Sequence, residues 1–129
     1  MKDDHFLKVV RIPTPDGTNN DKVLKQLNAL IETHNIAGFV YEPLVQGAAG
    51  MKMYDAQGLN EVLKVCKANK IITVADEVMT GFGKTGAYFA SLNIKELPDV
   101  ICLSKALTAG LVPMGITTCS QDIYDAFLD

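Results

Sequence analysis

The feature that most constrains the fold is an uninterrupted run of apolar and β-branched residues, Ile71-Ile72-Thr73-Val74-Ala75, which ends directly at Asp76-Glu77. A run without polar alternation predicts a strand that is covered on both faces, as strands of parallel sheets are. Parallel strands cannot be joined by a tight turn, so such a strand requires crossover segments before and after it. A chain built around this run is expected to alternate strands with helices.

The rest of the chain supplies that alternation. Apolar residues at helical spacing predict helices over residues 21–34 and 56–68, and a turn-rich segment precedes the first of them. Short apolar runs predict further strands over residues 6–12, 38–41, 100–103 and 114–118. The order of these elements predicts an α/β fold, a mostly parallel sheet with helices on both faces and right-handed crossovers.

Composition removes several classes of function. A chain of 129 residues that is 48% hydrophobic is large enough for one domain with a real core. The net charge is −3 and Arg11 is the one arginine, which argues against a nucleic-acid partner. No apolar run reaches the roughly 18–20 residues of a membrane span, and residues 1–5 lack the apolar stretch of a signal peptide. Three cysteines without a CxxC pair indicate free, buried thiols, so we expect a cytoplasmic protein without a membrane partner.

Polar residues follow three of the predicted strands at the point where each strand ends. Glu42 closes the first, Asp76-Glu77 the second and Ser104-Lys105 the third. Ligands of open parallel sheets bind outside the carboxyl ends of the strands. A polar residue that closes a buried strand is often only structural, but three in one small sheet, with both signs of charge, indicate a binding site.

Lys105 and Asp76 together suggest a particular chemistry. A lysine directly after a buried strand is expected to lose water from its ammonium group, which lowers the pKa and frees the amine to attack a carbonyl. A carboxylate at a neighbouring strand end is what keeps a pyridine nitrogen protonated, so the pair is typical of a pyridoxal phosphate site. Val78 would offer an apolar face to that ring. The structural alternatives are a surface lysine or an ion pair with Asp76, and a plain core position for Val78.

A second motif gives an alternative interpretation. Gly81-Phe82-Gly83-Lys84-Thr85-Gly86 satisfies GxGxxG, the pattern of a dinucleotide-binding module without catalytic function. Five residues separate the preceding strand from the first glycine, and two of them are carboxylates that would repel a pyrophosphate. The glycines are therefore expected to form a tight loop.

Other common catalytic sets are missing from the pattern. The two histidines, His5 and His34, lie near the N-terminus and at the end of a predicted helix, and neither has metal-ligating neighbours at a suitable spacing. We expect no metal. No Ser–His–Asp or Cys–His set can be assembled from the remaining residues.

Two motifs in tandem resemble a known family. DEVMTGFGKTG at residues 76–86 and PDVICLSKAL at residues 98–107 resemble the signature of the class III pyridoxal-phosphate aminotransferases, and the separation of 29 residues from Asp76 to Lys105 (105 − 76) is typical of it. The resemblance extends over residues 6–127. It implies that residues 1–129 form the central part of the large, cofactor-binding domain of a fold-type I pyridoxal-phosphate transferase, without the N-terminal part and the small domain.

The resemblance also implies roles for individual residues. Lys105 would form a Schiff base with pyridoxal 5'-phosphate and then move the proton of the substrate. Asp76 would pair with the pyridinium nitrogen, and Val78 would pack on the ring. Glu42 and Gln46 would lie near the substrate, with roles that the pattern does not assign. The family further implies a homodimer with its site at the subunit interface.

The loop EPLVQGAAGM at residues 42–51 refines the resemblance. It is most similar to the branch of the family that acts in biotin biosynthesis, where S-adenosylmethionine donates an amino group to 8-amino-7-oxononanoate. Relatives that act on ornithine or 4-aminobutyrate typically carry an extra glutamate here, where this chain has Ala48-Ala49. The alternative within the family is an aminotransferase for an ω-amino acid or a diamine. Lys84 and Ala109 replace a more usual arginine and glycine.

Overall fold

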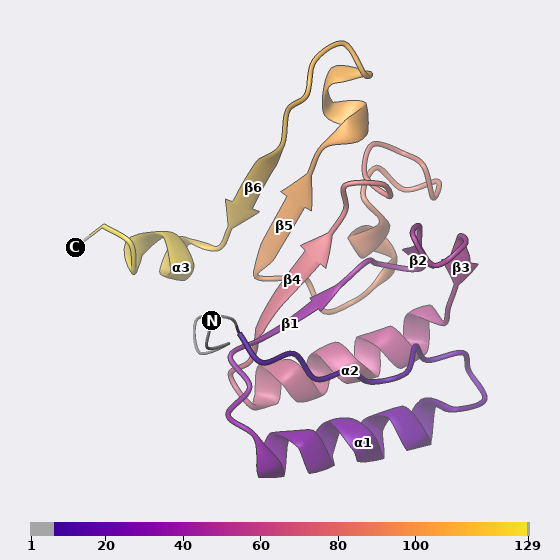
Figure 1. The fold of residues 1–129 in the computed structure, drawn as a ribbon, viewed down its shortest axis with the longest axis vertical. Helices are drawn as coiled ribbons and strands as arrows, with labels where there is room; N and C mark the ends of the chain where they lie inside the picture. Colours follow the sequence, from indigo (N-terminus) through magenta and orange to yellow (C-terminus); the bar gives the residue numbers. More distant parts are fainter. Residues whose placement is uncertain (1–6, 129) are drawn as a thin grey trace, which may run out of the picture.

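The computed structural model describes residues 7–128, and its centre is a four-stranded sheet in the order β1-β4-β5-β6. Figure 1 shows β1 (Gly38–Tyr41), β4 (Ile72–Asp76) and β5 (Val100–Leu103) running in one direction and β6 (Ile116–Cys119) in the other. The register places Val40 beside Val74, and Val74 beside Val100. The prediction of a mostly parallel α/β fold is confirmed.

Two long helices cover one face of this sheet. Helix α1 (Asn20–Thr33) lies beside α2 (Ala56–Ala68), and both are on the same side of the strands in Figure 1. The remaining helical segments of the described residues are short: the 3₁₀ turns η1 (Ala90–Asn93) and η2 (Lys105–Thr108), and α3 (Gln121–Asp125). Within residues 7–128, the two long helices thus lie on the same face of the sheet.

The burial pattern of β4 shows the same asymmetry. Thr73 and Ala75 face the helices and are fully buried, whereas Ile72 on the other face is 43% exposed. The sequence pattern predicted a strand covered on both faces because its residues are apolar or β-branched throughout. Such a pattern indicates which side chains tolerate burial, but not whether anything covers them. Within the described residues, the face of β4 opposite the helices is only partly covered.

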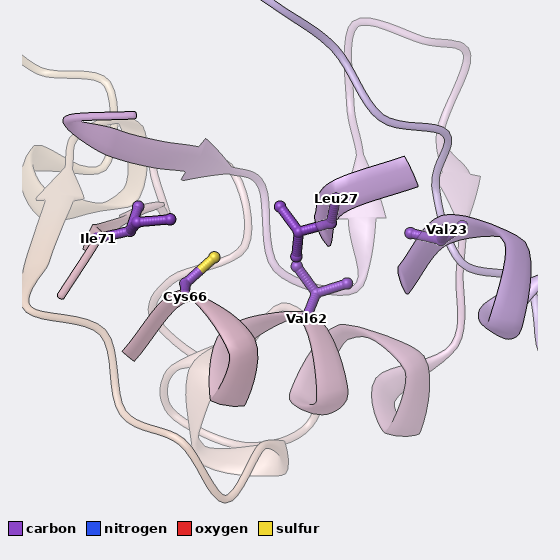
Figure 2. Close-up of a cluster of buried hydrophobic side chains, with 5 residues drawn as sticks. All are labelled: Val23, Leu27, Val62, Cys66 and Ile71. Carbon is purple, nitrogen blue, oxygen red and sulfur yellow. The ribbon is translucent and has the colours of Figure 1, made fainter. Parts of the chain in front are cut away.

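The core lies between the sheet and the two helices, and α2 contributes to both of its halves. One cluster joins α1 to α2 and the start of the central strand, as Figure 2 shows, and consists of Val23, Leu27, Val62, Cys66 and Ile71. A second cluster packs α2 under β1 and β4 and consists of Tyr41, Leu59, Leu63, Ala75 and Ile94. Each valine, leucine or isoleucine of these clusters contributes roughly 1.5–3 kcal/mol by leaving water.

Several local expectations need correction. Residues 7–12 join no strand, while Phe6 of the predicted segment lies outside the described residues. The predicted strand at 114–118 forms at Ile116–Cys119 and pairs antiparallel with β5. The loop after β1 contains a hairpin of two-residue strands, β2 (Val45–Gln46) and β3 (Lys52–Met53), which is too short to leave a period in the sequence.

Not every cysteine is buried as the sequence suggested. Cys66 is buried, Cys102 is half-buried and Cys119 is exposed, and all three are free. Separately, none of the helices within residues 7–128 has the length and apolar character that crossing a membrane requires.

The start of α2 is bonded to the start of α1 and packs against the segment before α1. Asp55 caps the helix: its Oδ2 accepts hydrogen bonds from the Gly58 amide at 2.6 Å and from the Asn20 side chain at 3.0 Å. A Cβ on Gly58 would lie 2.5 Å from the Pro15 Cβ, far inside van der Waals contact. The close approach of two chain segments therefore requires glycine inside this helix.

We expect Gly58→Ala to destabilise the protein by about 1–3 kcal/mol through this clash. Helix propensity alone predicts the opposite, a gain of about 1 kcal/mol for alanine over glycine. Urea unfolding followed by circular dichroism measures the difference. Lys64→Ala, on the exposed side of the same helix, is the control and should change stability by less than about 0.5 kcal/mol. A stabilised Gly58→Ala variant would contradict the packing described here.

We expect Asp55→Ala to cost about 1 kcal/mol at pH 7, as removal of a helix cap usually does. Hydrogen bonds from Asn20 and Gly58 lower the pKa of Asp55 in the folded chain below its unfolded value. The stability that these bonds give to the ionised form is therefore present above about pH 4 and lost as the pH falls through the folded pKa. Unfolding of both proteins at pH 7 and pH 3 tests this, and a difference that does not shrink at pH 3 would refute it.

Candidate active site

The carboxyl ends of β1, β4 and β5 meet at one edge of the sheet and border a cleft of about 530 Å³. Parallel pairing makes this meeting unavoidable, because neighbouring parallel strands end on the same side. The residues that line the cleft come from the three strand ends and from the β2–β3 hairpin: Glu42, Gly47, Ala48, Met51, Asp76, Val78, Met79 and Lys105.

The centre of the cleft is formed by the end of β4. Asp76 is half-buried, and its Oδ1 accepts a hydrogen bond from the Val78 amide at 3.1 Å. This bond turns the chain sharply after the strand, so that Asp76 and Val78 both reach the cleft. A carboxylate and an apolar side chain thus stand side by side.

One wall of the cleft is the hairpin that follows β1. Glu42 accepts a hydrogen bond from the Gly47 amide at 2.8 Å through its Oε2, and the Tyr54 hydroxyl donates to the Glu42 backbone carbonyl. Burial raises the pKa of Tyr54 well above its ordinary value, which keeps this donor protonated. A Cβ on Gly47 would lie 2.7 Å from the Met79 sulfur, so any larger residue here would require the Met79 side chain to move.

The third side of the cleft holds Lys105, at the first position of η2. Its backbone φ is +39°, in the left-handed region that lysine rarely adopts. The preceding Ser104 donates a hydrogen bond from its Oγ to the Met114 carbonyl at 2.6 Å, which closes the turn behind the lysine. The turn directs the chain away from β5 while Lys105 still borders the cleft.

The expected loss of water around Lys105 is not found. Lys105 is exposed, and so is every residue from Leu111 to Ser120, because within residues 7–128 nothing packs over this return segment. The sequence argument took the burial of the strand to extend to the next residue. In the structure burial ends at Leu103.

The glycine-rich segment forms a loop, as expected. The Gly83 amide donates to the Tyr88 carbonyl at 3.0 Å, and the first helical residue after Gly86 is Ala90, in the four-residue turn η1. A dinucleotide site needs a helix that starts directly at the glycines. The geometry of residues 81–86 therefore does not support the dinucleotide-binding alternative.

The cleft contains most of the residues that the sequence suggested, together with others that it did not. Glu42, Asp76, Val78 and Lys105 line it, whereas Gln46 lies in β2 and is not among the lining residues. Met79 was missed because strand alternation stops at Asp76, so no period assigns the residues after it to a face. Nowhere in residues 7–128 do three or more histidine, cysteine or acidic side chains gather as a metal site would need.

Comparison with known proteins shows the family of this chain. The family described as aminotransferase class III matches residues 4–129. Adenosylmethionine-8-amino-7-oxononanoate aminotransferase of Staphylococcus aureus is 42% identical over 111 residues, which are 86% of this chain and 24% of the relative. The protein of the same name from Synechococcus elongatus is 48% identical over 93 residues, 72% of this chain and 22% of the relative. The chain thus spans about a quarter of the length of these relatives.

Solved structures show the same likeness. The omega-transferase from Vibrio fluvialis JS17 superposes with a TM-score of 0.83 at 28% identity, over 92% of this chain and 32% of that one. An (S)-enantioselective omega-transaminase from Thermomicrobium roseum gives a TM-score of 0.78 at 32% identity, over 82% of this chain and 24% of that one. The family resemblance of the two motifs is confirmed: this chain belongs to the class III aminotransferase family.

Proposed function

We propose that this chain carries the cofactor-binding centre of a pyridoxal-phosphate-dependent aminotransferase. The observation that supports the proposal most is the cleft that brings Lys105 together with Asp76 and Val78 from separate strand ends. These residues are the amine, carboxylate and apolar face that pyridoxal 5'-phosphate requires.

The residues present fit this cofactor. A cleft of about 530 Å³ lies within the range of roughly 300–1,000 Å³ that small-molecule sites occupy. Bound there, pyridoxal phosphate supplies an aldehyde that condenses with amines and a ring that draws electrons from the substrate. Asp76 would hold the proton on the ring nitrogen, and Val78 would pack against the ring and exclude water from it.

Lys105 would have two roles. Its Nζ would hold the cofactor covalently, and as a free amine at the same edge of the sheet it would take a proton from the substrate Cα. Since Glu42 and Asp76 also line the cleft, the charge that Lys105 gains on protonation has negative partners nearby.

For the substrates we propose S-adenosylmethionine as the amino donor and 8-amino-7-oxononanoate as the acceptor, as in biotin biosynthesis. The named relatives at 42% and 48% identity support this choice. The loop supports it as well, because Ala48 lines the cleft and Ala48-Ala49 occupy the stretch where, by the resemblance, relatives acting on ornithine or 4-aminobutyrate typically carry a glutamate. Glu42, which also lines the cleft, would lie near the bound substrate, whereas Gln46 lies in β2 and does not line the cleft.

A second candidate is an aminotransferase for an ω-amino acid or a diamine. The structural likeness to the omega-transaminase of Thermomicrobium roseum, at 32% identity, favours it. The cleft of this chain contains an amine, two carboxylates and thioethers but no arginine. An arginine that binds a substrate carboxylate would therefore come from outside the lining residues of this cleft.

We further propose that residues 1–129 are part of the large domain of this enzyme, which would act in the cytoplasm as a homodimer. The coverage of about a quarter of the curated relatives supports this division. In this family the phosphate-binding loop and the arginine that holds the substrate carboxylate belong to other segments. The 129-residue chain is expected to bind cofactor weakly and not to sustain transamination by itself.

We expect pyridoxal phosphate, followed by borohydride reduction and peptide mapping, to label Lys105 in preference to the other ten lysines of the chain. The cleft gives this one amine a carboxylate and an apolar wall that hold the cofactor beside it. Lys105→Arg should lose the label, since arginine keeps the charge but forms no such bond. Lys84→Ala, which removes an exposed lysine of the glycine-rich loop, should keep it. Label scattered evenly over the lysines would contradict the proposed site.

In a complete enzyme that includes these residues, we expect S-adenosylmethionine to be the preferred amino donor. Half-reactions with single donors, followed by the change in cofactor absorbance, separate the two candidate functions. The comparison donors are 4-aminobutyrate and ornithine, which the second candidate would use. Faster half-reactions with either of these than with S-adenosylmethionine would favour the second candidate.

A further inference from the structure

Glu77 stands between two residues of the cleft but does not line it. Asp76 and Val78 border the cleft on either side of it in the chain, whereas the Glu77 side chain is fully buried. The proposed function assigns it no role. A buried carboxylate beside a cofactor site nevertheless requires a physical explanation, because burial of an uncompensated charge is very costly.

The carboxylate of Glu77 is held by three hydrogen bonds from the chain that follows it. Oε2 accepts from the Ala90 amide at 2.8 Å and from the Thr80 hydroxyl at 3.0 Å, and Oε1 accepts from the Ser91 amide at 2.8 Å. Thr80 and Ala90 are fully buried and Ser91 nearly so. The side chain thus fastens the first turn of η1, thirteen and fourteen residues along the chain, to the end of β4.

The backbone of Glu77 is held as firmly. Its amide donates to the Cys102 carbonyl of β5 at 3.0 Å, and its carbonyl accepts from the Gly81 amide at 2.9 Å. Gly81 is confined in turn, since a Cβ there would lie 2.9 Å from the Glu77 carbonyl. Residue 77 is therefore fixed to β5, to the following turn and to η1 at once.

We propose that Glu77 is a positioning residue of the cleft, which holds Asp76 and Val78 in place by fastening the chain between them to η1. The loop from Val78 to Phe89 cannot shift without leaving a buried carboxylate or two buried amides unpaired. Glu77 touches neither cofactor nor substrate in this scheme. The effect of Glu77 on cofactor binding rests on the proposed function. The fastening of the loop rests on the hydrogen bonds alone.

Glu77→Gln is the sharpest variant. An amide group has the shape of the carboxylate, but its nitrogen cannot accept a hydrogen bond. Whichever way the glutamine lies, the Ala90 or the Ser91 amide loses its acceptor. Thr80→Val removes only the hydroxyl donor and is the milder variant if Glu77→Gln folds poorly.

The chain offers a matched control at the other end of the same strands. Asp99 Oδ2 accepts from the Thr73 amide at 2.7 Å and from the Thr73 hydroxyl at 2.6 Å, so it too is a carboxylate bonded to a backbone amide and a threonine. Asp99 does not line the cleft. Asp99→Asn also replaces a carboxylate by an amide, but its remaining oxygen can accept both bonds. Asp99→Ala removes both acceptors and gives the loss of stability for comparison.

The first measurement needs no cofactor. Amide hydrogen exchange in Glu77→Gln should accelerate by roughly tenfold or more over residues 78–91, relative to the wild type and to Asp99→Asn. Thr80→Val should accelerate the same residues to a smaller extent. Exchange that rises evenly over the whole chain, or not at all over residues 78–91, would overturn the positioning role whatever the cofactor does.

The second measurement is pyridoxal phosphate affinity, together with the share of borohydride label on Lys105. Glu77→Gln should weaken binding by roughly tenfold and spread the label, as displaced binding groups do. The Asp99 variants should leave the affinity and the share of label on Lys105 unchanged, even where they lose as much stability as Glu77→Gln. Equal effects of the Glu77 and Asp99 variants would reduce Glu77 to a stabilising residue and overturn the proposal. If the wild type itself shows no preference for Lys105, the proposed function fails, and hydrogen exchange alone decides the role of Glu77.

Discussion

Parallel hydrogen bonding of β4 to both β1 and β5 is the interaction on which the rest of the structure depends. It requires crossovers, and the crossover from β1 to β4 is α2, whose apolar side packs on the strands and on α1. It also sets the direction in which every strand ends. The cleft is a direct result, because three chain segments leave the sheet at one edge.

The elements that could be predicted are those with a clear pattern of apolar residues in the sequence. The helix at 56–68 has the predicted bounds because it combines a clear period with a cap. The strands at 38–41 and 100–103 have them because each is an apolar run bounded by turn residues. The β2–β3 hairpin could not be predicted, because two residues per strand carry no period. The partial exposure of the second face of β4 could not be predicted either, since apolar residues show that a face can be buried and not that it is.

The candidate site divides in the same way. Asp76, Val78 and Lys105 could be selected because chemistry-bearing residues at strand ends have a predictable location in a parallel sheet. The place of Met79 in the cleft and the burial of Glu77 away from it could not be predicted, since both depend on how the chain turns after β4. The direction of the Glu77 side chain is fixed by amides thirteen and fourteen residues away, which no local pattern contains. The exposure of Lys105 was mispredicted for a related reason, because burial of a strand does not determine what covers the residue after it.

The backbone at Lys105 carries a consequence for how such a site persists. A left-handed φ of +39° costs free energy for any residue with a side chain, and glycine would adopt it at less cost. At this one position the stability of the fold and the proposed chemistry favour different amino acids. A glycine here would relieve the strain but remove the amine on which the proposed function depends. Under that proposal, part of the stability of this turn is given up to place a reactive group at the cleft.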